Sequence, residues 1–79
     1  MQIKVLYFAQ LADLAGTDEE MRTLDNSAPA ALYAELKAAY GFPHEFNQLQ
    51  VAINHQLSAH NQALQDGDNI AFLPPMTGG

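Results

Sequence analysis

Apolar residues alternate along several short stretches of the chain, and a period of two predicts β-strands. In residues 2–9, Val5 and Tyr7 fall on one face of the predicted strand, and Leu6 and Phe8 fall on the other. A strand that is apolar on both faces is typical of the interior of a sheet. Three more strands are expected at residues 17–25, 50–54 and 69–73.

A helical period appears between the second and third predicted strands. Leu32, Leu36 and Tyr40 recur at every fourth position, with Tyr33 beside them, which predicts an amphipathic helix over residues 30–40. We expect its side chains Tyr33 and Tyr40 to pack in the core.

Residues suited to helix ends flank this segment. Ser27 is a suitable N-cap, and Pro29 is tolerated in a first turn. Gly41 stands where a helix commonly ends in a left-handed residue, and Pro43 prevents continuation.

The remaining segments predict short connections. At least one helical turn is expected at residues 10–15, a turn at 54–56, a loop at 58–62 and a tight turn at 64–68 around Gly67. The order strand, strand, helix, strand, strand predicts an α+β fold, with one main helix on one face of a mixed sheet of four to five strands.

In so short a chain, one helix covers only one face of the sheet, so the other face lacks an internal cover. The candidates for an exposed apolar docking patch are Phe8, Leu11, Leu57, Phe72 and Leu73. An exposed patch of this kind calls for a partner. Plain core packing is the alternative, and for Phe72 the sequence favours neither.

The end of the sequence predicts an extended tail. Its residues are Pro74, Pro75, Met76, Thr77, Gly78 and Gly79. Two consecutive prolines end a strand and favour an extended path, while glycines add no side chain, so such a tail fits a narrow channel of another protein. We therefore expect a folded domain over residues 1–73 and a tail over 74–79. A frayed terminus is the alternative.

Composition narrows the chemistry. An apolar content of 48% indicates a globular domain, and the absence of cysteine excludes thiol chemistry on this chain. Three basic residues against nine acidic ones argue against nucleic acid as a partner and favour a protein with a basic face. No apolar leader or membrane span is visible, which predicts a cytoplasmic location. His44, His55 and His60 match no metal-site spacing and are expected at the surface, so no metal site is predicted.

Taken together, five stretches resemble the small subunit of molybdopterin synthase. They are Leu6-Tyr7-Phe8-Ala9, residues 11–16, Val51-Ala52-Ile53-Asn54, Leu64-Gln65-Asp66-Gly67-Asp68 and residues 72–79. The chain departs from the family at Ala12-Asp13, where Arg-Glu is common, and at Leu73, where an aromatic residue is common. Both departures concern details of partner contacts.

The resemblance implies a ubiquitin-like β-grasp fold and a sulfur-carrier role. In that family, an adenylyltransferase similar to ubiquitin-activating enzymes uses ATP and Mg²⁺ to adenylate the terminal glycine, here Gly79. The resulting thiocarboxylate donates sulfur to cyclic pyranopterin phosphate on the large subunit of a heterotetrameric sulfurtransferase. Gly78 is implied to give steric access, the residues from Leu73 to Thr77 to contact partners, and no cofactor to be bound by this chain.

Three alternatives stay open from the sequence. The chain could feed sulfur to thiazole formation for thiamine, serve as a ubiquitin-like modifier joined to lysines through Gly79, or act as a β-grasp interaction module with an inert tail.

Overall fold

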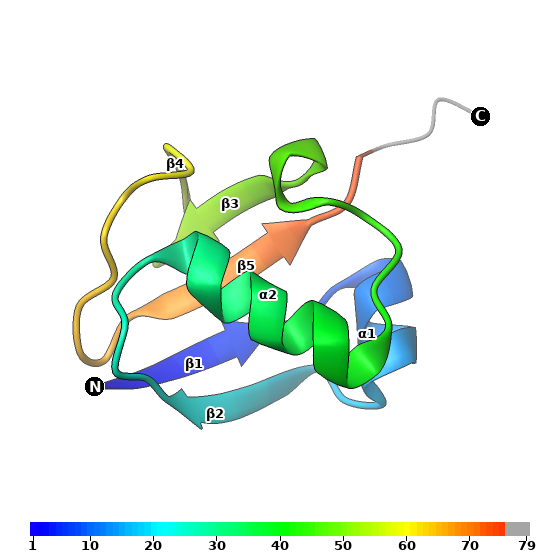
Figure 1. The fold of residues 1–79 in the computed structure, drawn as a ribbon, viewed down its shortest axis with the longest axis horizontal. Helices are drawn as coiled ribbons and strands as arrows, with labels where there is room; N and C mark the ends of the chain where they lie inside the picture. Colours follow the sequence, from blue (N-terminus) through cyan, green and yellow to red (C-terminus); the bar gives the residue numbers. More distant parts are fainter. Residues whose placement is uncertain (76–79) are drawn as a thin grey trace.

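The structure, a computed structural model, is described for residues 1–75 (Figure 1). Its elements are β1 (Gln2–Leu6), α1 (Ala9–Ala15), β2 (Glu19–Thr23), α2 (Pro29–Tyr40), the 3₁₀ turn η1 (Phe46–Gln48), β3 (Gln50–Ile53), β4 (Gln56–Ser58) and β5 (Asn69–Leu73).

The five strands form one mixed sheet in the order β2-β1-β5-β3-β4. β1 and β5 run parallel, and the other neighbours run antiparallel. Helix α2 lies across one face of this sheet (Figure 1). The predicted α+β arrangement, with one main helix on one face of a mixed sheet, is therefore confirmed.

The core lies between α2 and the sheet. Ile3 and Val5 of β1 and Ile70 of β5 are fully buried there, as is Leu36 of α2. Tyr33 packs its ring against Phe72 with 5.1 Å between ring centroids. Burying one such side chain contributes about 1.5–3 kcal/mol to the free energy of unfolding. The buried side chains of this layer together therefore supply most of the stabilisation of the domain.

The helix ends were predicted in part. Gly41 ends α2 in the left-handed region with φ 71°, and its N–H donates to the Lys37 carbonyl at 2.8 Å, as the sequence indicated. The prediction of Ser27 as N-cap is wrong, because the N-cap is Ala28 and carries no side-chain bond. The Asn26 carboxamide oxygen instead accepts the N–H of Ala28 at 2.8 Å.

The observed strand boundaries differ from the predicted ones more than the helix ends do. β1 ends at Leu6, and α1 begins already at Ala9, earlier than the expected turn at residue 10. β4 was expected as loop, because three residues carry too weak a period. It forms since Asn54 and His55, with φ 53° and 69°, make a two-residue turn that pairs β4 with β3.

Among residues 1–75, no helix is both long and apolar enough to cross a membrane.

Candidate functional site on the open face of the sheet

The face of the sheet opposite α2 carries the second set of alternating side chains. Register places Leu6 of β1 beside Ala71 of β5, Ala71 beside Ala52 of β3, and Ala52 beside Leu57 of β4. Leu73 follows Ala71 on the same face, two residues along β5. One row of apolar side chains thus crosses four strands without a helix above it.

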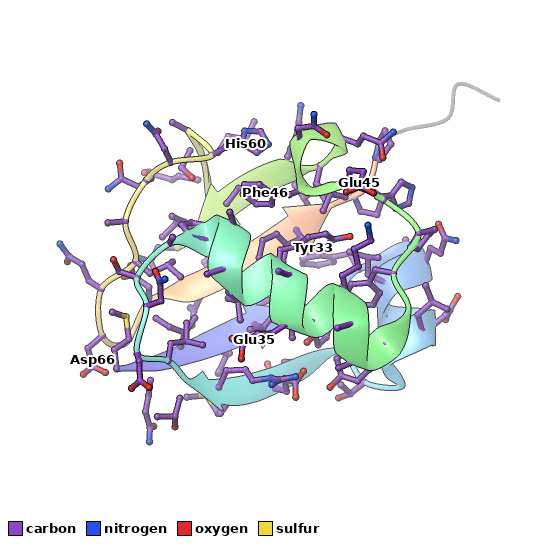
Figure 2. All side chains as sticks on the ribbon, viewed as in Figure 1. Tyr33, Glu35, Glu45, Phe46, His60 and Asp66 are labelled. Carbon is purple, nitrogen blue, oxygen red and sulfur yellow. The ribbon has the colours of Figure 1, made fainter. Side chains whose placement is uncertain are left out.

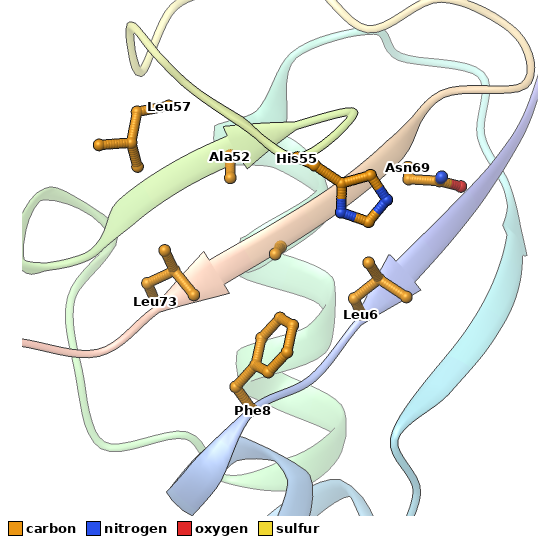
Figure 3. Close-up of a pocket in the computed structure, with 8 residues that line it drawn as sticks. Leu6, Phe8, Ala52, His55, Leu57, Asn69 and Leu73 are labelled. Carbon is orange, nitrogen blue, oxygen red and sulfur yellow. The ribbon is translucent and has the colours of Figure 1, made fainter.

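A shallow hollow of about 230 Å³ lies along this row. Its lining residues, which define the open-face hollow, are Leu6, Phe8, Ala52, His55, Leu57, Asn69, Ala71 and Leu73. Figure 3 shows it from the open side, with the Phe8 ring beside the side chains of Leu6 and Leu73 and with α2 behind the sheet. Phe8 remains 48% exposed and Leu57 66%. Apolar side chains left this exposed at a hollow are suited to a protein partner.

A second hollow of about 480 Å³ adjoins the first where β5 ends. The residues lining this tail-root hollow are Phe8, Ala9, Gln10, Gln50, Leu73, Pro74 and Pro75. Because Phe8 and Leu73 line both hollows, a partner that contacts these two side chains also reaches the start of the predicted tail.

Two of the five predicted docking residues are buried instead. Leu11 and Phe72 have no exposed surface, so neither contributes to an exposed patch. The prediction of exposure is wrong for Leu11, and for Phe72, where the sequence favoured neither interpretation, core packing is confirmed. Leu11 faces the core from α1. Phe72 alternates away from its neighbour Leu73 and packs under α2 against Tyr33.

The other predicted residues have three different outcomes. Phe8, Leu57 and Leu73 come together at the open-face hollow, and their role in docking stays a prediction. Pro74 and Pro75 lie at the tail-root hollow without regular secondary structure. Four residues lie outside the described part of the chain: Met76, Thr77, Gly78 and Gly79.

Five lining residues of the open-face hollow were absent from the candidates, although the strand period points to four of them. Leu6, the first of these four, lies beside Ala71 on the outward face of β1. Ala52 and Ala71 occupy outward positions of predicted strands, and Asn69 shares the outward face of β5 with Ala71. Their small or polar side chains gave no signal by themselves. His55 reaches the hollow only because of the hairpin turn before β4, which was not expected to lead into a strand.

A polar cluster secures the chain immediately before Phe8. The hydroxyl of Tyr7, which is buried, donates to Glu20 Oε1, and the hydroxyl of Tyr40 donates to the same oxygen at 2.7 Å. Arg22 Nε lies 3.6 Å from the other carboxylate oxygen of Glu20. One carboxylate on β2 thereby connects the end of β1 with the last residue of α2.

Opposing effects set the protonation of this cluster. Burial opposes ionisation of Glu20, but the hydroxyls of Tyr7 and Tyr40 and the charge of Arg22 outweigh it, so the Glu20 pKa lies below its ordinary value. Burial, and next the bond to Glu20, raise the pKa of Tyr7. At neutral pH the carboxylate is therefore charged and both tyrosines are protonated donors.

The three histidines differ in their surroundings. His60 packs edge-on against Phe46, with ring centroids 5.0 Å apart (Figure 2), and its Nε2 donates to the Leu49 carbonyl at 2.6 Å. His44 is half-buried and presents its carbonyl to the Tyr33 hydroxyl at 2.8 Å. The prediction of surface histidines is confirmed for His55 and His60, which are exposed, whereas His44 is only half-exposed. Within residues 1–75, no three His, Asp or Glu side chains gather as a metal-binding group.

The fold and the open face together define a ubiquitin-like β-grasp domain. Its backbone superposes on SAMP1 from Haloferax volcanii with a TM-score of 0.79 at 24% identity over all of both chains, which is a likeness of fold. It also superposes on a chain in the complex of subunits 1 and 2 of molybdopterin-converting factor from Helicobacter pylori, with a TM-score of 0.68 at 26% identity over all of both chains.

Sequence comparison gives the family. The model of the ThiS family matches residues 5–79, so the chain belongs to the ThiS family. It is also 39% identical to the molybdopterin synthase sulfur carrier subunit of Escherichia coli, over 98% of this chain and 99% of that protein. The family expected from the sequence is confirmed.

Proposed function

We propose that this chain is the sulfur carrier subunit of a molybdopterin synthase and acts in the cytoplasm. The observation that carries the proposal is the 39% identity to a sulfur carrier subunit along 98% of the chain. The family match extends to residue 79 and thus includes both terminal glycines.

The proposed chemistry is centred on Gly79. Its carboxylate attacks the α-phosphorus of ATP, pyrophosphate leaves, and a sulfur nucleophile then displaces AMP to give a thiocarboxylate. On the large subunit, the thiocarboxylate sulfur bonds to a carbon of cyclic pyranopterin phosphate and displaces its oxygen substituent, and water then cleaves the thioester, which leaves the sulfur on the pterin and restores the Gly79 carboxylate. Adenylation is needed because a bare carboxylate, ionised at neutral pH, is a poor acyl donor.

The catalytic cations have to come from partners. All three basic side chains of this chain lie beside glutamates: Lys4 beside Glu19, Arg22 beside Glu20 and Lys37 beside Glu45. Phosphoryl and adenylyl transfer require several positive charges around the phosphates. In the proposal, an adenylyltransferase binds ATP and Mg²⁺, and this chain supplies the carrier tail of a sulfur-transfer complex without an acid–base set of its own.

For the large subunit we propose docking on the open-face hollow. A docking face of ordinary size buries about 800 Å² on each partner, so we propose that the interface also covers the adjoining tail-root hollow. Contact at Phe8 and Leu73 would place the start of the tail at the rim of the interface. The family expectation of two carriers and two large subunits per complex belongs to this proposal.

The decisive experiment is intact mass spectrometry after incubation with the activating enzyme, Mg-ATP and a sulfur source. A mass gain equal to one oxygen replaced by sulfur, mapped to Gly79, is expected. Two controls, a chain lacking Gly79 and a chain extended by one alanine, should show no gain and keep the unfolding midpoint of the parent. No gain in the parent, with the enzyme active on another carrier, would overturn the proposal.

A second experiment tests the docking face through two exposed leucines. Leu57→Ala removes a side chain of the open-face hollow, whereas Leu14→Ala removes one on α1 that lines neither hollow. Calorimetric titration with a molybdopterin synthase large subunit should show weaker binding for Leu57→Ala and unchanged binding for Leu14→Ala. Equal losses in both variants would contradict docking at the hollow.

The remaining functions are distinguished by the acceptor. A thiocarboxylate that restores thiazole formation but leaves the pterin unsulfurated would assign the chain to the thiamine route. Lysine-linked conjugates that depend on Gly79, in cells whose pterin sulfuration is normal without this chain, would assign it as a protein modifier.

A further inference from the structure

The backbone of Ala9 adopts a conformation that L-residues other than glycine rarely take. Its φ is 51°, in the left-handed region, at the junction between β1 and α1. The other non-glycine residues with positive φ, Asn54 and His55, form the β3–β4 hairpin turn, where such angles are required. Ala9 occupies no hairpin, so its strain needs another cause.

Buried anchors fix the chain on both sides of this junction. On the strand side, Tyr7 is buried, and its N–H donates to the Asp18 carbonyl at 2.8 Å. On the helix side, Leu11 is fully buried, and its N–H donates to the Phe8 carbonyl at 3.1 Å. Between Tyr7 and Leu11 only three residues are available to change from strand to helix.

The positive φ of Ala9 allows the chain to change from strand to helix within these three residues. Phe8 keeps extended angles, φ −129° and ψ 149°, so strand alternation continues through it and directs its ring to the open face. The chain then turns at Ala9, so that α1 can bury Leu11 within two residues. Strain held in place by its surroundings is common where a side chain must be oriented for function.

We infer that Ala9 is a positioning residue: its left-handed backbone holds the exposed Phe8 ring against Leu6 and Leu73 at the open-face hollow, ready for a partner. Ring placement concerns the free protein and stands by itself. The effect of ring placement on binding affinity rests on the proposed function, because that proposal identifies the large subunit as the partner.

The first test needs no partner. In proton NMR, the Phe8 ring should shift the methyl signals of Leu6 and Leu73 upfield, and Phe8→Ala should abolish these shifts. Ala9→Val, which disfavours positive φ through its branched side chain, should reduce them toward the Phe8→Ala values. Ala9→Gly, which adopts positive φ freely, should retain them.

Matched substitutions on α2 control for general effects on helices. Ala34 is exposed on α2, away from the open face. Ala34→Gly should lower the unfolding midpoint, because glycine is a poor helix former, whereas Ala9→Gly should not lower it. Ala34→Val should leave the methyl shifts of Leu6 and Leu73 unchanged. Unfolding midpoints of all variants establish that each is folded at the temperature of the NMR measurement.

The second test is a double-mutant cycle with a molybdopterin synthase large subunit. Phe8→Ala should weaken binding by roughly 30-fold, the size of an aromatic anchor. Ala9→Val alone should weaken binding by most of the same factor. In a protein that already carries Phe8→Ala, Ala9→Val should change affinity less than about twofold, because no ring remains to position.

Each contrary result overturns a separate claim. Unshifted Leu6 and Leu73 methyls in the folded parent, or shifts unaffected by Ala9→Val, would refute the positioning role whatever the partner. Equal losses in both backgrounds would show that Ala9 makes its own contact instead. A parent that does not bind the large subunit would refute the proposed function, while the NMR result would still decide the role of Ala9.

Discussion

Replacing Glu20 should destabilise the fold by an amount that depends on both the substitution and the pH. Glu20 Oε1 accepts the hydroxyls of Tyr7 and Tyr40, and Arg22 lies beside the other oxygen. Glu20→Ala leaves the buried Tyr7 hydroxyl without its acceptor, which costs about 1–3 kcal/mol, and removes a second bond to a charged group. We expect the free energy of unfolding to fall by about 3 kcal/mol at pH 7.

Glu20→Gln separates the charge from the hydrogen bonds. A glutamine oxygen still accepts from the tyrosines, so only the charge-assisted part of the interaction is lost, about 1 kcal/mol. Since the native pKa of Glu20 is lowered, the stability due to its charge is present above the unfolded-state pKa of about 4.3 and is lost as the pH falls through the native pKa. The parent and Glu20→Gln should therefore differ in stability at pH 7, and the difference should be smaller at pH 3.

Urea denaturation of both proteins at the two pH values measures this difference. Glu19→Gln is the matched control, because Glu19 lies on the same strand and only approaches Lys4, at 4.0 Å on the surface. Such an exposed pair contributes little, so this variant should be near neutral. A Glu20→Gln deficit that is the same at both pH values, or no larger than that of Glu19→Gln, would refute the assigned role of the carboxylate.

Three further outcomes test the fold and the surface charge. Gly41→Ala, at φ 71° with open space around it, should cost about 1 kcal/mol through backbone strain alone and lower Tm by about 4–8 °C in calorimetry; an unchanged Tm would contradict this. Tyr33→Phe should cost about 1 kcal/mol in urea titrations by removing the 2.8 Å bond to the His44 carbonyl, and a neutral result would show that this bond contributes nothing. The association rate with the large subunit should fall about tenfold between low and high salt in stopped-flow measurements if the net charge of −6 steers docking, and a flat response would exclude steering.

The fold could be predicted closely because its signals are local and repeated. Alternating apolar residues identified β1 around Val5 and β5 around Phe72, and the helical period of Leu32 and Leu36 identified α2. β4 escaped prediction, because its single apolar residue Leu57 carries no period. Its existence depends on pairing with β3, which is a tertiary contact.

The site was predicted less completely, because exposure depends on which way each element faces. Alternation could have separated Phe72 from Leu73, since neighbours in a strand point to opposite faces. For Leu11 the sequence left both docking and core packing open, because nothing in the local sequence demands the positive φ that Ala9 adopts at the start of α1. Its burial follows from packing against the sheet.

The unpaired acidic charges and the apolar open face lie on different parts of the molecule. Lys4, Arg22 and Lys37 each lie within 4.0 Å of a glutamate oxygen, so the surplus acidity resides in the other carboxylates. None of the residues lining the open-face hollow is acidic, and none is lysine or arginine. In the proposed docking, a partner with basic groups would therefore be attracted by surface outside the hollow, while the hollow itself would contribute by apolar burial. It follows that salt should act mainly on the association rate, and substitution of Leu57 mainly on the dissociation rate.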